Sequence, residues 1–321
     1  MRVFGSFGVD VFFVISGYIM ARILHTNSDF FFLRRVLRIV PPYWIFTILL
    51  FFVALYAPRL MGATRASGSQ LLMSLFFIPF AKSNGLIQPL LFIGWSLNYE
   101  MFFYLALSIG LLFNKRHAVW IGASLVLATM LVGIPFTTVS VAARFYSRDI
   151  VLEFPLGILS YYVAGAVSDT NARRLRLASL AVSVSSALLL IVIQGFLIPQ
   201  GASVSHLLAF GFLSFFLVTS ASLLSQGGWD TNLSWLVLIG DASYILYLIH
   251  PYCLYSFDRI LGASHPWLKD QMPVGAFIGV MLSIVLAVLL HLYGERPMVR
   301  ALNSRFGGKR RSAEFSTPVA K

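Results

Sequence analysis

Long apolar runs, separated by short segments that carry charge, glycine or proline, follow one another along most of the chain. A helix needs about 20 mainly apolar residues to cross the hydrocarbon core of a bilayer. Nine runs approach or exceed this length: near residues 8–24, 38–58, 90–113, 118–136, 150–167, 175–198, 206–224, 235–257 and 274–293. The pattern therefore predicts an all-α integral membrane protein, a polytopic helical bundle with nine transmembrane helices.

A tenth apolar run, from Leu71 to Phe80, is shorter than the others. It contains Pro79 near its end, and the polar stretch from Lys82 to Gly85 follows it. A run of about ten residues is too short to span the bilayer as a helix. We therefore expect a re-entrant or interfacial segment here rather than a further crossing.

The composition agrees with a membrane protein, since 58% of the residues are hydrophobic and only 11% are charged. Soluble domains are usually about 45–50% apolar and about a quarter charged. The net charge of +12 would suggest nucleic acid as a partner of a soluble protein, but here we assign it to membrane topology. The single cysteine, Cys253, excludes an intramolecular disulfide and a cysteine-based metal cage. The sequence predicts no nucleic-acid partner and no metal site.

The distribution of Lys and Arg predicts the orientation, because short cytoplasmic loops collect these residues. If the first run enters from outside, sixteen of the 24 Lys and Arg lie on the inner side. The C-terminus is then cytoplasmic, and only seven residues precede the first run outside. This arrangement leads us to expect a further helix before that run in the complete protein. We divide the chain into a transmembrane domain, residues 1–299, and a basic, disordered cytoplasmic tail, residues 300–321, that contacts anionic lipids.

Ionisable side chains inside the apolar runs are candidates for function, because each costs at least about 2.5–3.5 kcal/mol to insert. The candidates are Asp10, Glu100, Glu153, Asp241, His250 and His291. The alternative is that these groups pair or neutralise one another within the bundle and only fix its packing. The residue pattern alone leaves both interpretations open.

The first run contains the segment GVDVFFVISGYIM, with an acid near its outer end. Helical spacing places four of its residues on one face: Asp10, Phe13, Val14 and Gly17. Ser16 and Gly17 are small enough to let a neighbouring helix approach closely. They form either a packing notch or part of a substrate site.

The segment FFFLRRVLRIVPPYW carries three arginines, Arg34, Arg35 and Arg38, before a helix that we expect to begin at Pro41-Pro42. Arg34 and Arg38 are four residues apart and are neighbours on one helical face. A guanidinium presents a planar fork of donors that matches phosphate oxygens. The cluster is either a phosphate site or a topology anchor.

Two later segments place polar groups on helical faces. In GWSLNYEMFFYLAL the shared face consists of Ser96, Glu100, Phe103 and Tyr104, and in GDASYILYLIHPY it consists of Gly240, Ser243, Tyr244, Tyr247 and His250. A buried carboxylate binds a cation, relays protons or orients a partner. Pro251 removes a backbone hydrogen bond, so we expect a kink beside His250.

These four segments, in this order and together with Glu295-Arg296-Pro297, resemble the membrane acyltransferase-3 family, in particular its exopolysaccharide O-acetyltransferase branch. The resemblance covers residues 8 to 300. It implies a ten-helix enzyme with both termini in the cytoplasm. Such enzymes transfer an acyl group, commonly acetyl, from acyl-coenzyme A as co-substrate to a sugar hydroxyl at the outer face of the bacterial inner membrane.

The resemblance also directs the assignment of site residues. We expect Arg34, Arg35 and Arg38 to bind the phosphates of coenzyme A, and Asp10, Glu100 and His250 to form the catalytic polar interior. The family carries a catalytic histidine, with an upstream arginine, before the GVD motif; the segment MRVFGSF contains Arg2 but no histidine.

The predicted partners are membrane lipids, acyl-coenzyme A and a polysaccharide or lipid-linked sugar. Two other functions remain open from the sequence. The intramembrane acids also suit a transporter or proton-coupled permease. A catalytically inactive partner in polysaccharide export is the other possibility.

Overall fold

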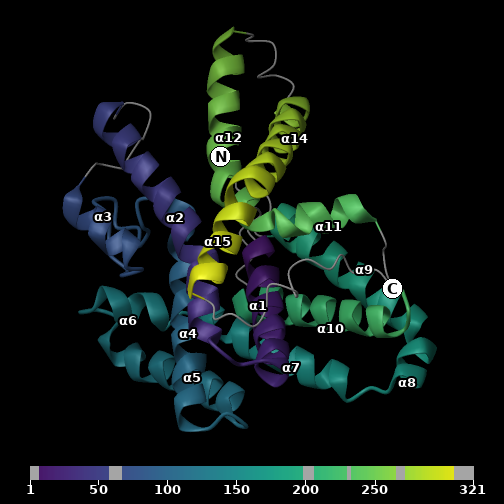
Figure 1. The fold of residues 1–321 in the computed structure, drawn as a ribbon. Helices are drawn as coiled ribbons and strands as arrows, with labels where there is room; N and C mark the ends of the chain where they lie inside the picture. The colour runs from purple at the N-terminus through teal and green to yellow at the C-terminus, as the bar shows by residue number, and fades with distance from the viewer. Residues whose placement is uncertain (1–6, 58–66, 198–205, 230–232, 265–271, 307–321) are drawn as a thin grey trace. The chain divides into compact units, whose positions relative to one another are not determined.

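The computed structural model describes residues 7–57, 67–197, 206–229, 233–264 and 272–306. Within these ranges the chain is helical, with one isolated β-bridge between Ala81 and Ile87. The α-helices (Figure 1) are α1 Phe7–Thr26, α2 Phe31–Tyr56, α3 Gly68–Leu75, α4 Trp95–Phe113, α5 Ala118–Gly133, α6 Val141–Tyr146, α7 Glu153–Gly165, α8 Asp169–Arg174, α9 Arg176–Val192, α10 Phe212–Gln226, α11 Ser234–Asp241, α12 Ser243–Ser264, α14 Met272–Leu290 and α15 Arg296–Phe306. The predicted all-α class is confirmed for the described part of the chain.

Shorter helical turns extend or connect several of these helices. Three are 3₁₀ turns, η2 Phe92–Gly94, η3 Ile134–Phe136 and η4 Asp149–Leu152. Three are π-helical, η5 Ile193–Leu197, η7 Leu207–Gly211 and η8 His291–Glu295. The π-helical turns matter for function because such turns often occur at functional sites.

Seven segments of the described chain are long and apolar enough to cross a membrane: Phe7–Thr26, Phe31–Tyr56, Phe92–Phe113, Ala118–Phe136, Arg176–Phe196, Leu207–Gln226 and Phe277–Phe306. The number rises to eight if α11 and the following part of α12 form one bent span. The run expected at 150–167 forms α7, whose 13 residues are too few to count among the seven. The protein is therefore a multi-pass membrane protein, and the described residues do not confirm the predicted number of nine spans.

Helix α2 differs from the prediction at its start, because it begins at Phe31 and contains Pro41 and Pro42 in its interior. Proline is common at the first position of a helix, which is why the sequence suggested a start there. Proline has no backbone N–H, so the two prolines cannot make the helical hydrogen bonds to the carbonyls of Leu37 and Arg38. The other hydrogen bonds of the helix do not involve these N–H groups. Membrane helices tolerate such a gap where neighbouring groups satisfy the backbone. The arginine segment is consequently part of the helix and does not precede it.

The run predicted at 235–257 is broken, since α11 and α12 meet at an angle of 72°. The break lies at Ala242, between the two helices, whereas α12 continues through Pro251. The strong bend of this run therefore lies eight residues before His250. Gly240 and Asp241 are weaker helix formers than the residues around them, so this position yields first. Asp241 is the last residue of α11 and is exposed beside the break.

The end of the chain also departs from the prediction. Helix α15 continues to Phe306, so residues 300–306 of the tail that was expected to be disordered are helical. The remainder of that tail, residues 307–321, lies outside the described residues.

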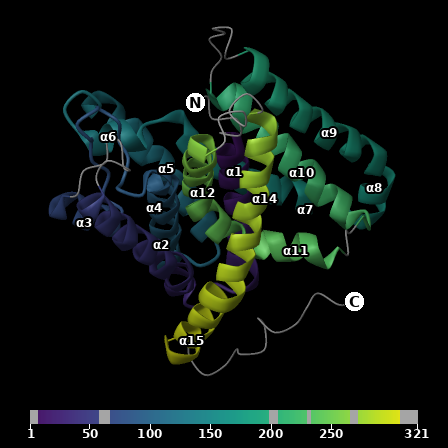
Figure 2. The same cartoon turned by 90° about the horizontal axis from the view of Figure 1, so that it is seen from above.

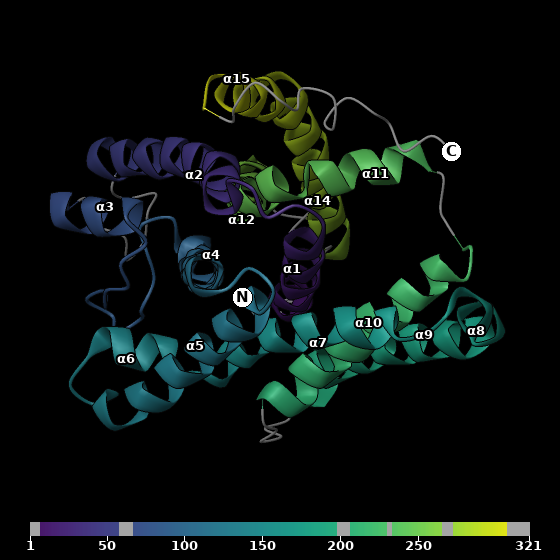
Figure 3. The same ribbon diagram turned by 60° about the horizontal axis from the view of Figure 1, so that its bottom comes forward.

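The chain forms two compact units. Unit 1 comprises residues 1–32, 77–87 and 95–231, and unit 2 comprises residues 33–76, 88–94 and 232–321. In unit 1, α1 packs along α7, α4 packs on α5, and α9 packs on α10 (Figure 3). In unit 2, α12 and α14 lie side by side (Figure 2).

Two glycines explain how closely α1 and α7 approach. A Cβ atom on Gly17 would collide with the carbonyl oxygen of Phe154, and a Cβ atom on Gly157 would collide with that of Val14. Small residues allow membrane helices to bring their backbones together in this way. The close helix contact predicted at Gly17 is confirmed, and it fixes the position of the first turn of α7 against α1.

In unit 2, the short helix α3 is attached to α2 by hydrogen bonds. The hydroxyl of Tyr43 donates to the carbonyl of Ser74 over 3.1 Å, and Nε1 of Trp44 donates to the carbonyl of Leu75 over 2.9 Å. The Ser74 hydroxyl in turn accepts from the amide of Leu90 at 2.9 Å. Eight residues of helix extend about 12 Å, which is too short for a crossing, as the sequence predicted.

Candidate active site

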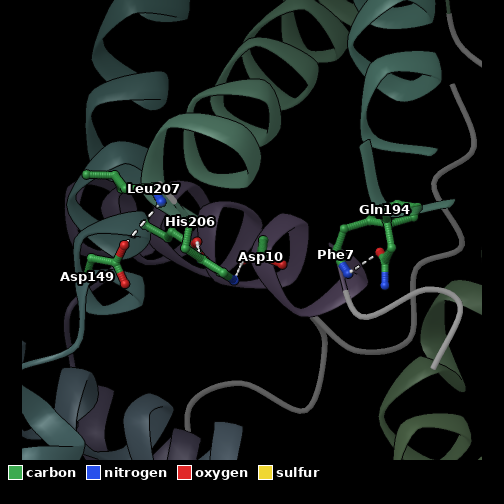
Figure 4. Close-up of polar contacts among 7 residues, drawn as sticks. Phe7, Asp10, Asp149, Gln194, His206 and Leu207 are labelled. Atoms are coloured by element: carbon green, nitrogen blue, oxygen red, sulfur yellow. Dashed lines mark hydrogen bonds and ion pairs between the residues drawn. The ribbon is translucent and has the colours of Figure 1, made fainter. Parts of the chain in front are cut away.

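Three ionisable side chains from distant parts of the sequence meet in unit 1. Asp10 lies in the first turn of α1, Glu153 begins α7, and His206 directly precedes the π-helical turn η7. Nε2 of His206 is 3.3 Å from Oδ1 of Asp10, and its Nδ1 is 3.6 Å from Oε1 of Glu153. Figure 4 shows the ring of His206 extending toward Asp10. We call these three residues the Asp10 cluster.

Neighbouring contacts fix the segments that carry the cluster. The amide of Leu207 donates to Oδ2 of Asp149 at 3.2 Å, and the amide of Phe7 donates to Oε1 of Gln194 at 3.1 Å (Figure 4). A Cβ atom on Gly211 would lie only 2.8 Å from Cδ1 of Leu207 and 3.4 Å from Cγ of Glu153, so the glycine leaves room for Leu207 beside the cluster. The ends of α1 and η7 are therefore held where their side chains face one another.

The cluster is deeply buried on its acidic side. Asp10 is 3% exposed and Glu153 is 0% exposed, while the side chain of His206 is 39% exposed. Neither carboxylate oxygen of Glu153 accepts a hydrogen bond within the described part of the chain. A buried carboxylate in this state requires a proton or a cation nearby, because the bare charge is costly in an apolar medium.

Sequence reasoning found Asp10 and Glu153 but missed His206. There was little indication of His206 in the sequence, because it stands at the boundary of an apolar run, where polar residues are common. Only the packing of α1, α7 and η7 places the histidine against both acids.

Glu100 occupies a different environment in the same unit. Its side chain is 4% exposed, and the hydroxyl of Tyr104, one turn later on α4, donates a hydrogen bond to Oε1. Ser96 and Phe103 are buried beside them, so the face predicted for this segment is confirmed. Glu100 is not a member of the Asp10 cluster.

The three arginines lie in the first two turns of α2, in unit 2. Arg34 and Arg35 are half-buried, and Arg38 is exposed. Helix α12 is attached beside them, because the hydroxyl of Tyr244 donates to the carbonyl of Ile39 over 2.7 Å. The arginine segment and the polar face of α12 are therefore neighbours within unit 2.

Tyr247 and His250 continue the polar face of α12. The hydroxyl of Tyr247 donates to the carbonyl of Ile93 over 2.8 Å. Nδ1 of the half-buried His250 is 3.1 Å from the carbonyl oxygen of Leu246 and 2.9 Å from that of Tyr247. Gly240, which was expected on this face, lies on α11 beyond the break.

The surroundings of His250 select its tautomer. Carbonyl oxygens only accept hydrogen bonds, so Nδ1 carries the hydrogen, and Nε2 of the neutral ring keeps its lone pair. A histidine in this state is able to take up a proton at Nε2. By contrast, Nδ1 of His291 is 2.7 Å from Oε2 of Glu295, which pairs that ring with an acid on its own helical segment.

Comparison with known proteins places the chain in a family. The family model described as "Acyltransferase domain" matches residues 1–292. The chain belongs to this acyltransferase family. It is also 30% identical over 310 residues to exopolysaccharide production protein ExoZ of Rhizobium meliloti (strain 1021), an alignment that covers 94% of this chain and 92% of that protein. No solved structure matches the chain.

The acyltransferase also has a cavity that the sequence did not suggest. It has a volume of about 430 Å³ and is lined by Tyr18, His25, Tyr161, Tyr162, Gly165, Ala166 and Gln226, all in unit 1. The rings of His25 and Tyr161 are 5.3 Å apart, and Tyr162 stacks on Trp120 at 4.9 Å. Aromatic faces with polar tips are typical of pockets for flat or ring-shaped ligands.

Proposed function

We propose that this acyltransferase moves an acetyl group from acetyl-coenzyme A to a hydroxyl of an exopolysaccharide or another cell-envelope glycan. The observation that carries the proposal is the acyltransferase family match over residues 1–292, together with a relative named for exopolysaccharide production. The enzyme would act in the bacterial inner membrane, with its arginine segment at the cytoplasmic side.

The proposal includes nine membrane crossings. The seven full-length spans and the bent pair of α11 and α12 supply eight. The ninth is the continuous segment formed by η4 and α7, residues 149–165. Seventeen helical residues extend about 25 Å, close to the hydrocarbon thickness of about 30 Å.

The donor site is proposed at the start of α2, where Arg34, Arg35 and Arg38 would bind the phosphates of coenzyme A. Guanidinium groups bind phosphate oxygens through paired, charge-assisted hydrogen bonds. Tyr244 attaches α12 at the residue that follows Arg38, and His250 lies six residues further along α12. Six residues of helix rise about 9 Å, so the flexible arm of the donor would lead from the arginines toward the histidine.

Acetyl transfer needs a base for the acceptor hydroxyl, and His250 is the proposed base. Its Nε2 takes the hydroxyl proton as the acceptor oxygen bonds to the thioester carbonyl carbon. The carbon–sulfur bond then breaks, and the imidazolium returns the proton to the thiolate of coenzyme A. Asp10 and Glu100, both in unit 1, are proposed as further polar groups of the enzyme's interior.

The test is the acetyl content of the cell-envelope glycan in a strain that lacks the gene. Nuclear magnetic resonance would measure acetyl groups per sugar after complementation with the wild type, with His250→Gln and with His117→Gln. His117 is an exposed histidine that lies outside the four family-like segments, and it is the matched control for His250. We expect the wild type and His117→Gln to restore acetylation and His250→Gln to fail. Unchanged acetylation in the deletion strain would contradict the proposal.

The same measurement separates the two other functions. A permease or an inactive export partner would change the amount of polymer outside the cell but not the acetyl groups per sugar. A transporter built from inverted repeats also has interrupted helices in corresponding positions of both halves. The described chain has one such bent pair, α11 with α12.

A further inference from the structure

We propose that the Asp10 cluster is a binding site for a divalent metal ion of the zinc class. The cluster consists of Asp10, Glu153 and His206, all in unit 1. One ligand atom from each residue lies within 4.8 Å of those from the other two. The inference concerns metal binding by these residues and does not depend on acyl transfer.

The distances suit a small ion. Nitrogen and oxygen ligands bind zinc at about 2.0–2.2 Å, so two ligands of a tetrahedral site are about 3.4 Å apart. The separation between Nε2 of His206 and Oδ1 of Asp10 is 3.3 Å, which matches this value, and a ligand atom of Glu153 lies within 4.8 Å of the other two. One nitrogen of the imidazole and one oxygen of each carboxylate would bind the ion.

Glu153 presents its carboxylate oxygens to the centre of the cluster. Its side chain is 0% exposed and points into the cluster, and neither oxygen accepts a hydrogen bond within the described part of the chain. Asp10 is 3% exposed and adds a second acid beside it. A dication would balance the two carboxylate charges and would satisfy their oxygens directly.

The donor set selects the kind of ion. Two carboxylates and one imidazole are nitrogen and oxygen donors without a thiolate, which suits Zn²⁺ or Mn²⁺ better than Cu⁺. Three protein ligands leave at least one further position for water or a ligand, as in open zinc sites. The side chain of His206 is 39% exposed, so the cluster is not closed on that side.

The three ligands come from segments that contact one another. Gly17 and Gly157 bring α1 and α7 into backbone contact, and the carboxylate of Asp149 holds the amide of Leu207 directly after His206. The π-helical turn η7 begins at that residue. π-helical turns often accompany functional sites, and here the turn directs the histidine toward both acids.

The experiment measures metal bound to the full chain. The protein would be purified in detergent, stripped with a chelator, loaded with Zn²⁺ and desalted, and zinc per chain would be measured by mass spectrometry. We expect one zinc per wild-type chain and affinity reduced about tenfold or more in Glu153→Gln and His206→Gln. Glu295→Gln is the matched control, because Glu295 is also a buried acid paired with a histidine, but with no third ligand in the described chain.

A second measurement keeps the test decisive if a variant does not fold. Wild-type protein loaded with Co²⁺ should show the visible absorption of a four- or five-coordinate site, and a chelator should remove it. Zn²⁺ should also raise the unfolding temperature of the wild type and of Glu295→Gln. Absence of bound zinc in the wild type would overturn the proposal, as would equal zinc binding by the folded cluster variants.

Discussion

At the scale of single residues, Glu100 shows how a carboxylate is accommodated inside a membrane helix. It lies on a buried face of α4, and the hydroxyl of Tyr104 donates to it from one turn later. This hydrogen bond within one helix helps to accommodate the buried acid. The spacing of four residues made this face predictable from the sequence.

The first prediction removes this hydrogen bond by Tyr104→Phe. The variant leaves a buried carboxylate with one donor fewer, so the free energy of unfolding should fall by about 1–3 kcal/mol. Unfolding in detergent by a mild denaturant measures the change. Tyr56→Phe is the control, because Tyr56 is 80% exposed and its hydroxyl can bond to solvent. Equal stability of the two variants would show that Tyr104 does not support Glu100.

The arginines of α2 allow a second prediction at this scale. Arg35→Ala and Arg38→Ala should each weaken acetyl-coenzyme A binding by roughly 10–100-fold, because a hydrogen bond to a charged group contributes about 1.5–3 kcal/mol. Isothermal titration with the purified protein measures the dissociation constant. Arg116→Ala, an exposed arginine in the loop before α5, should leave it unchanged. If all three variants bind the donor equally well, the arginines serve only topology.

At the scale of helices, the contact between α1 and α7 depends on glycine. Backbone atoms of each helix occupy the space that a Cβ atom on the other would need. Without a hydrophobic driving force between helices in lipid, such close van der Waals packing contributes much of the association. The same contact aligns Asp10 with Glu153, so the packing of these helices also builds the candidate metal site.

The third prediction tests this contact with Gly157→Ala. The added methyl group would meet the carbonyl oxygen of Val14, and the free energy of unfolding should fall by about 1–3 kcal/mol or more. Gly165→Ala is the matched control on the same helix, because no atom lies within 4 Å of its added Cβ. Thermal unfolding in detergent compares the two. If both variants change the stability by the same amount, the cause is the helix propensity of alanine and not the contact between α1 and α7.

At the scale of the whole molecule, the polar groups divide between the two compact units. Unit 1 contains the Asp10 cluster, Glu100 and the aromatic cavity. Unit 2 contains the arginine segment and His250. Tyr244 and Tyr247 attach the helix that carries His250 to the carbonyls of Ile39 and Ile93. The two units therefore carry different ionisable groups: buried carboxylates with a histidine in unit 1, and guanidinium groups with a histidine in unit 2.

The fourth prediction concerns topology and whether α7 crosses the membrane. In a Cys253→Ser background, single cysteines would be placed at Asn114, Thr137 and Thr170 and labelled in intact cells with an impermeant maleimide. We expect labelling at Thr137 only, since the distribution of Lys and Arg places the loops around Asn114 and Thr170 inside. Labelling at Thr170 without permeabilisation would show that α7 does not cross. Permeabilised cells, in which all three sites should react, provide the control.

The sequence by itself determined the membrane class, the approximate position of most helices and the buried faces around Asp10 and Glu100. These features depend on hydrophobic length and on spacings of three and four residues, which are local properties of the chain. The four ordered segments also carried the family resemblance, which the match over residues 1–292 confirmed. The assigned roles of Arg34, Arg35, Arg38 and His250 stay predictions.

Only the tertiary structure decided which of these faces meet. It brought His206 to Asp10 and Glu153, moved the bend of the last polar segment to Ala242 and extended α2 across Pro41. Periodicity cannot determine such features, because it shows which side of a helix is buried but not which helix covers it. Helix pairing depends on close packing between segments that are distant in sequence, such as the glycine contact of α1 and α7.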